Sequence, residues 1–146
     1  MIYFDSSALV KRYLKEIGTD VVNSLIISSR IKATSKLSYP EILSAFARKH
    51  RANEISVGLL HSAINKFESD WTQLYVIEFS DEMLQPIKEI SQKHPLRAAD
   101  TVHLVSALWL RSSIKVDVTF VASDARLVEA AQRENLQIVN PLNKGG

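Results

Sequence analysis

The sequence contains no cysteine among its 146 residues. This absence excludes disulfides, thiolate metal sites and a cysteine nucleophile, and it is typical of a reducing compartment. The four histidines are scattered along the chain and show neither HExxH nor a similar zinc-binding spacing. Neither GxxxxGK nor GxGxxG occurs, which excludes P-loop and dinucleotide-binding folds.

The sequence also lacks a long hydrophobic run. The longest mainly apolar stretch, residues 102–110, contains His103 and Ser106 and is too short to span a bilayer. The first apolar run is four residues long and ends at Asp5, so it does not resemble a signal peptide. We therefore expect a cytoplasmic protein that does not interact with a membrane.

A strong charge of one sign is absent as well. The formal net charge is +2 and the isoelectric point is about 8.9, which is compatible with a polyanionic partner without requiring one. Basic and aromatic residues are not interleaved, which argues against a surface dedicated to stacking single-stranded bases. With 46% hydrophobic and 23% charged residues, the composition predicts one globular domain over residues 1–146.

Short strand-like runs alternate with helical patterns along the chain. Apolar runs predict strands at residues 2–4, 31–34, 75–77, 118–121 and 137–139. Apolar residues at helical spacing predict helices from residue 8 toward Gly18 and at residues 21–26, 38–53, 56–67, 81–93, 97–111 and 124–134. Because helices between successive strands imply parallel crossovers, the sequence predicts an α/β fold: a three-layer sandwich with a central parallel sheet.

Two aspartates follow predicted strands. Asp5 directly follows the first strand, and two residues separate Asp124 from the fourth. Because parallel α/β sheets bind ligands beyond the carboxyl ends of their strands, we expect both carboxylates at one rim. Each aspartate also precedes a predicted helix, where it can accept backbone N–H bonds as an N-cap. Glu41, three residues after Ser38 in SYPE, fits a capping box in the same way.

A further acid, Asp100, lies in LRAADTVHLVSALWL, a predicted helix that is apolar around most of its circumference and is expected to be buried. A carboxylate in such a helix costs roughly several kcal/mol unless a cation or a hydrogen-bond donor meets it. Its position is too near the middle of the predicted helix for capping to be its main role. An ion pair with Arg97 or Arg111 is the structural alternative to a functional role.

Carboxylates gathered at one rim repel each other, so a protein seldom assembles them without a cation. Oxygen ligands without cysteine or paired histidine point to Mg²⁺ or Mn²⁺. His103 lies one turn after Asp100 on the same helical face. There it either packs behind the acids or contributes to the site directly.

Four stretches carry these acids in a fixed order: YFDSSALVKRYL, SYPEILSAFAR, LRAADTVHLVSAL and TFVASDARLVEAA. Their order and separations resemble the PIN-domain ribonucleases, especially the VapC-type toxins of toxin–antitoxin pairs, and the likeness runs from Ile2 to Pro141. The resemblance implies one PIN-like domain with a quartet of catalytic, metal-binding acids: Asp5, Glu41, Asp100 and Asp124. It also implies that Ser7 and Ser123 support the first and last acids.

A protein of this family is a metal-dependent endoribonuclease. The resemblance implies that water activated by Mg²⁺ or Mn²⁺ attacks an RNA phosphodiester, leaving a 5′-phosphate and a 3′-hydroxyl. It further implies a cognate VapB-like antitoxin and a homodimer. The apolar helices at residues 21–27 and 59–67 are candidate contacts for an amphipathic antitoxin segment. The candidate contacts for RNA phosphates are Lys11, Arg12, Arg97 and Arg126.

Three alternatives use a similar arrangement of residues. A receiver domain, which is a Mg²⁺-binding signalling module, requires paired acids after the first strand and an aspartate after the third. Here Ser6 follows Asp5, and the third run ends in VIEFSDE. A haloacid-dehalogenase phosphatase requires a second aspartate at position 7, which is Ser7. The third alternative is a PIN module that binds a partner without cleaving, and the presence of all four acids argues against it.

Overall fold

The computed structural model describes residues 1–143, in which five strands form one sheet. The strands are β1 (Ile2–Phe4), β2 (Lys32–Ser35), β3 (Tyr75–Ile77), β4 (Thr119–Val121) and β5 (Gln137–Val139). Their order in the sheet is β3-β2-β1-β4-β5, and every neighbouring pair is parallel. The predicted central parallel sheet is confirmed.

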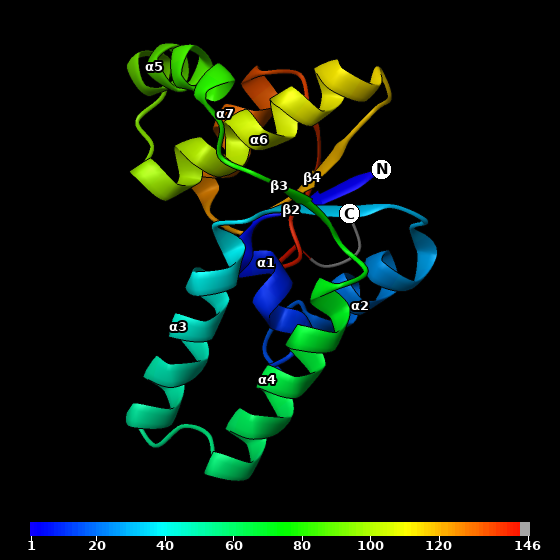
Figure 1. Ribbon diagram of the computed structural model, residues 1–146, viewed down its shortest axis with the longest axis vertical. Coiled ribbons are helices and arrows are strands. Elements are labelled where there is room, and N and C mark those ends of the chain that lie inside the picture. Colours follow the sequence, from blue (N-terminus) through cyan, green and yellow to red (C-terminus); the bar gives the residue numbers. More distant parts are fainter. Residues whose placement is uncertain (144–146) are drawn as a thin grey trace.

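Helices cover both faces of this sheet (Figure 1). The α-helices are α1 (Ser6–Leu9), α2 (Thr19–Ser28), α3 (Ser38–Arg51), α4 (Val57–Trp71), α5 (Leu84–Lys93), α6 (Ala98–Ile114) and α7 (Ala125–Arg133), with short 3₁₀ helices η1 (Val10–Arg12) and η2 (Asp81–Met83). In Figure 1, α5, α6 and α7 lie on one side of the sheet and α1 to α4 on the other, where α3 and α4 extend away from it as a hairpin. This confirms the predicted three-layer sandwich.

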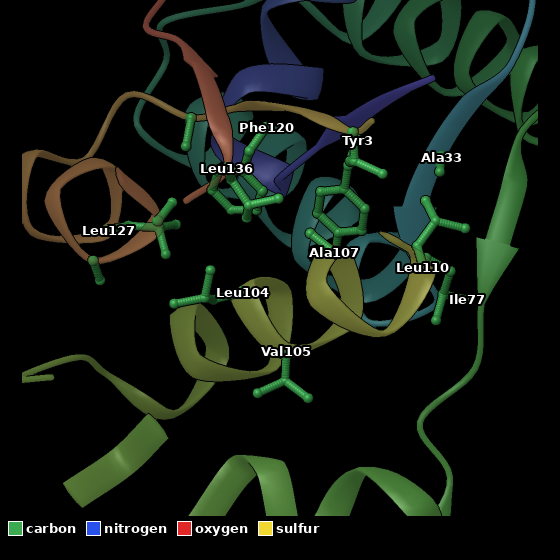
Figure 2. Packing of buried hydrophobic residues seen from close by; sticks show 14 of the residues in the cluster. Tyr3, Ala33, Ile77, Leu104, Val105, Ala107, Leu110, Phe120, Leu127 and Leu136 are labelled. Carbon is green, nitrogen blue, oxygen red and sulfur yellow. The ribbon is translucent and has the colours of Figure 1, made fainter. Parts of the chain in front are cut away.

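The alternation of side chains along each strand divides the core into two layers. In β1, Tyr3 points into the cluster beneath α6 and α7, whereas Phe4 points into the cluster beneath α3 and α4. In β4, Phe120 joins Tyr3, and the two rings stack with their centroids 5.5 Å apart. Figure 2 shows this first layer, in which Leu104 of α6 packs toward the sheet.

The order of the strands places a switch point at β1. From β1 the chain proceeds to β2 and β3 on one side, and it then returns to form β4 and β5 on the other. Phe4 is in register with Val121, so β1 and β4 end at the same level. Crevices for ligands form at the carboxyl ends of strands where the direction of winding reverses. The fold therefore creates a site between the ends of β1 and β4.

The first helix differs from its prediction. Instead of continuing toward Gly18, it is divided into α1 and η1, and Gly18 is the N-cap residue of α2. Gly18 has a φ of +97°, a left-handed conformation that glycine adopts without strain. A Cβ at this position would lie 2.9 Å from the Cβ of Pro141. Gly18 therefore allows the backbone to turn close to Pro141, and it does not end a helix as predicted.

No helix within residues 1–143 is both long enough and apolar enough to cross a membrane.

Candidate active site

Asp5 lies at the carboxyl end of β1, beside β4. Its backbone N–H donates to the carbonyl of Val121 at 3.1 Å. The side chain is buried, and its Oδ1 accepts a hydrogen bond from the backbone N–H of Ala8 at 2.9 Å. The Ser7 hydroxyl is 3.0 Å from Oδ1 and 2.9 Å from Oδ2 of the same carboxylate. Asp5 is thus the cap of α1, and Ser7 restrains its carboxylate.

Asp124 occupies the equivalent place after β4. Its Oδ1 accepts a hydrogen bond from the backbone N–H of Leu127 at 3.0 Å and so caps α7. Its Oδ2 lies 3.9 Å from Nη2 of Arg97. The cap uses one oxygen, and the other oxygen is within reach of a cation.

Glu41 comes from α3 and does not form the predicted capping box. The N-cap residue of α3 is Leu37, which makes no side-chain cap bond, and the Ser38 hydroxyl instead shares a hydrogen bond with Oγ1 of Thr34 at 2.6 Å. Glu41 accepts a hydrogen bond on Oε1 from Nε2 of His103 at 2.8 Å. The capping-box prediction is wrong because Ser38 and Glu41 both have tertiary partners from other segments.

Asp100 lies in the first turn of α6, which begins at Ala98, so the prediction that it lies near the middle of its helix is wrong. Arg97, the residue directly before α6, has an extended backbone and is the N-cap residue of this helix. Its Nε lies 3.5 Å from Oδ2 of Asp100. Arg111, the other predicted partner, donates to backbone carbonyls that follow α7. Asp100 is therefore a partly buried acid at a helix start, next to one exposed arginine.

All four acids line one cavity of about 820 Å³. They come from four separate segments, namely the turn after β1, helix α3, helix α6 and the turn after β4. Ser7 and Ser123 line the same cavity. The structure thus brings together every acid and hydroxyl that the sequence motifs singled out.

Two of the four predicted phosphate contacts also line this cavity. Lys11 is largely buried, and its Nζ lies 2.7 Å from Oε1 of Glu16. Arg97 is exposed and contacts both Asp100 and Asp124. These two cations have different surroundings, because Lys11 is held by a partner at the cavity wall whereas Arg97 projects from a helix start.

The other two predicted contacts lie outside the cavity lining. Nε of Arg12 is 2.7 Å from Oδ2 of Asp70 on α4, and its Nη1 donates to Oδ1 of Asn23 on α2 at 3.1 Å. Arg12 therefore links two helices. Arg126 lines a neighbouring cavity of about 400 Å³, which shares Arg97 with the first.

Arg48 lines the cavity and was not predicted. It is exposed and follows Glu41 by seven residues on α3, which is about two helical turns. Residues at this spacing share one face of a helix. The interval between Glu41 and Arg48 is therefore the signal in the sequence that would have identified this cation.

A curated protein resembles the chain over most of its length. The sequence is 32% identical to Ribonuclease VapC45 of Mycobacterium tuberculosis over 108 residues, which is 74% of this chain and 75% of that protein. The chain belongs to the VapC ribonuclease family. This relationship confirms the family that the four motifs indicated. No family model matches the sequence.

Solved structures share the fold of this VapC-family chain. A toxin–antitoxin complex from Klebsiella pneumoniae matches with a TM-score of 0.66 and 12% identity, covering 97% of this chain and 98% of that one. VapBC2 from Rickettsia felis, bound to a DNA fragment from its promoter, matches with a TM-score of 0.65 and 17% identity, covering 96% and 98%. At these identities the likeness establishes the fold alone.

The lining of the VapC-family cavity offers donor atoms that suit a divalent cation. Its acids offer oxygen atoms, the ligands that Mg²⁺ and Mn²⁺ prefer. Oγ of Ser123, at the cavity wall, is a buried side-chain oxygen without a hydrogen-bond partner among residues 1–143. Such an atom calls for a bound water or ion. The chemistry of the lining therefore fits a hard cation.

The acids do not form a ready-made cluster. Within the described part of the chain, no three histidine, aspartate or glutamate side chains are close enough together to hold a metal ion. Arg97 contacts Asp100 and Asp124, while His103 contacts Glu41. Because the Arg97 side chain is 81% exposed, it can leave these acids at little cost when a cation enters.

Burial and neighbouring groups shift the pKa values of the acids in this cavity in different directions. Burial raises the pKa of Asp5 from 3.8 to about 6. Burial also raises the pKa of Asp100. Burial would raise the pKa of Glu41 too, but the hydrogen bond and charge of His103 outweigh it and lower that pKa. The site therefore disfavours the charged forms of Asp5 and Asp100 unless a cation is present.

The raised pKa of Asp5 predicts a pH-dependent stability. Between pH 3.8 and about 6, folded Asp5 holds a proton that the unfolded chain has released. Metal-free stability should therefore fall as the pH rises through this window. Asp5→Asn has no carboxyl group at this position and so lacks the effect. The free energy of unfolding of Asp5→Asn minus that of wild type should therefore increase by about 2–3 kcal/mol from pH 4 to pH 7. Urea unfolding in EDTA at several pH values measures this.

The exposed Asp117 provides the control for this measurement, since Asp117→Asn removes a carboxylate outside the cavity. Its stability relative to wild type should change little across the same range. A constant difference between Asp5→Asn and wild type at all pH values would contradict the burial argument.

Proposed function

We propose that the chain is a metal-dependent endoribonuclease that acts as the toxin of a toxin–antitoxin pair. The observation that carries this proposal is the convergence of four acids from four segments on one cavity, in a member of the VapC ribonuclease family. Asp5, Glu41, Asp100 and Asp124 are the proposed metal ligands and catalytic residues. Mg²⁺ or Mn²⁺ is the proposed ion, because both accept the oxygen donors that these acids offer.

A bound Mg²⁺ or Mn²⁺ would activate water near neutral pH and would neutralise charge on the phosphodiester. Asp5, Asp100 and Asp124 would hold the cation, with Ser7 restraining the Asp5 carboxylate. Ser123 would offer its hydroxyl, which has no hydrogen-bond partner within residues 1–143. Glu41 would bind a second ion or orient the attacking water. The products are an RNA end with a 5′-phosphate and another with a 3′-hydroxyl.

The cations of the cavity wall provide the proposed contacts for the RNA backbone. Arg48 and Arg97 are exposed and line the cavity from α3 and from the start of α6. Lys11 is the third proposed contact, although Glu16 already neutralises it. Arg126 can extend this path through the neighbouring cavity, whereas Arg12 is assigned a structural role because Asp70 and α2 engage it. Such contacts position RNA through phosphates and do not select its sequence.

A VapB-like antitoxin is the proposed partner, because the solved structures that share this fold include a toxin–antitoxin complex and VapBC2 bound to promoter DNA. The two candidate helices have both buried and exposed apolar side chains. Val22, Ala63 and Phe67 are core residues, but Ile27 on α2 and Leu59 on α4 are exposed. These exposed side chains are the proposed contacts for an amphipathic antitoxin segment.

We also propose that residues 1–146 act as a single PIN-like domain, that two copies form a homodimer, and that the protein works in the cytoplasm, where its RNA substrate is found. Light scattering after size-exclusion chromatography measures the homodimer directly, as twice the chain mass of 16.4 kDa.

The toxin role predicts a growth phenotype. Expression of the wild-type chain alone should arrest the growth of its host, because RNA cleavage stops protein synthesis, and co-expression of the cognate antitoxin should restore growth. Asp5→Asn, produced at the same level, should be harmless. Colony counts and immunoblots measure both. If intact wild-type chain is harmless in a host that lacks the antitoxin, the toxin role is wrong, even if purified protein cuts RNA.

A further inference from the structure

Three hydrogen-bonded side chains lead from the core of the sheet to the cavity. The hydroxyl of Tyr3 on β1 lies 2.8 Å from Nδ1 of His103 on α6, and Nε2 of His103 lies 2.8 Å from Oε1 of Glu41 on α3. Tyr3 is 0% exposed and His103 is 1% exposed, whereas Glu41 lines the cavity. Figure 2 shows Tyr3 against α6, within the layer that packs this helix onto the sheet.

The chemistry of the groups sets the direction of the hydrogen bond to Glu41. An ionised carboxylate only accepts, so Nε2 of His103 must carry the hydrogen that Glu41 accepts. A phenol hydroxyl can donate to a ring nitrogen or accept from one, so the hydroxyl of Tyr3 pairs with Nδ1 of His103 whichever of the two carries the hydrogen. Both ring nitrogens of His103 are then engaged, and neither is left to bind a metal ion.

We propose that Tyr3 and His103 are positioning residues that hold the Glu41 carboxylate in place at the active site. This inference rests on the proposed function, in which Glu41 binds an ion or orients the attacking water. Glutamate is a long side chain with several rotamers, and the bond from His103 fixes one of its oxygens while the second stays available for a ligand. Groups that orient metal ligands in this way typically contribute about 10- to 100-fold to metal affinity or activity.

His94 provides a matched contact elsewhere in the molecule. Its Nε2 lies 2.8 Å from Oε2 of Glu134, and the histidine is buried, as His103 is. Neither His94 nor Glu134 is among the residues that line the cavity of the four acids. The pair therefore lies away from the active site and contributes only to the fold. Its loss measures the effect on stability of a histidine–carboxylate contact that has a structural role alone.

The test combines Mn²⁺ affinity, measured by calorimetry without RNA, with kcat and KM for RNA cleavage. Tyr3→Phe removes the hydroxyl but keeps the ring that stacks on Phe120. His103→Leu removes the donor to Glu41, and His103→Gln retains an N–H group in its place. Tyr3→Phe and His103→Leu should weaken Mn²⁺ binding and lower kcat by about 10- to 100-fold with little change in KM. His103→Gln should recover most of both losses.

Two controls separate positioning from general destabilisation. His94→Leu should lower the melting temperature but leave Mn²⁺ affinity and kcat unchanged. In a Glu41→Gln background, Tyr3→Phe should cause no further loss of kcat, because its effect passes through Glu41.

Unchanged Mn²⁺ affinity and kcat in folded Tyr3→Phe would overturn the inference, as would an equal loss in His94→Leu. A wild-type chain that neither binds Mn²⁺ nor cuts RNA would instead refute the proposed function, and the positioning role with it.

Discussion

Asp100→Asn should lower RNA cleavage in Mg²⁺ by about 10²- to 10³-fold, because a group that fixes charge at the transition state is lost. In EDTA the same variant should be as stable as wild type or more stable. Burial and the Asp124 carboxylate both raise the pKa of Asp100, so its charge is unfavourable in the metal-free protein. The charge of the nearby Arg97 lowers that pKa and offsets part of the rise, but the net shift is upward. A cleavage assay in Mg²⁺ beside a thermal melt in EDTA measures both effects.

Asp70→Asn is the matched control for Asp100→Asn. Asp70 accepts hydrogen bonds from Nε of Arg12 at 2.7 Å and from the Tyr13 hydroxyl at 2.9 Å, and it lies outside the cavity lining. Its substitution should lower the melting temperature and leave cleavage nearly unchanged. If Asp100→Asn shows this same pattern, with lost stability and retained cleavage, then Asp100 is a structural aspartate and not a catalytic one.

Chelation with EDTA should abolish RNA cleavage by the wild-type chain, and excess Mg²⁺ or Mn²⁺ should restore it. The protein offers oxygen donors but no cysteine nucleophile, and both ring nitrogens of the histidine nearest the acids are engaged. Activation of water and neutralisation of the phosphodiester therefore depend on the cation. Cleavage of a 3′-labelled RNA, whose labelled fragments carry the newly formed 5′-phosphate, measures the loss and the recovery.

Mn²⁺ should also raise the melting temperature of the wild-type chain, because a ligand that binds only the folded state stabilises it by mass action. Asp100→Asn should show a much smaller rise. Asp5→Asn, purified in parallel, controls for contaminating nucleases. Vigorous cleavage by the wild-type chain in EDTA, absent from the Asp5→Asn preparation, would show that the acids act without a metal and that the proposed mechanism is wrong.

The sequence alone was sufficient to predict the sheet and the rim at which the acids meet. Short apolar runs separated by helical spacing permit little besides parallel crossovers, and the carboxyl ends of parallel strands share one edge. The places of Asp5 and Asp124 followed from this rule, since each comes shortly after a strand that the pattern identifies. The family was also determined by sequence, because four motifs in a fixed order are a property of the chain itself.

Only the tertiary structure decided the partners of individual side chains. Lys11 and Arg12 are neighbours in sequence, yet Lys11 lines the cavity and Arg12 links α2 to α4, because adjacent residues on a helical turn face different directions. The hydrogen bonds that join Tyr3, His103 and Glu41 span 100 and 62 residues of sequence. No local pattern encodes such contacts, since they depend on how α3 and α6 pack at the end of β1.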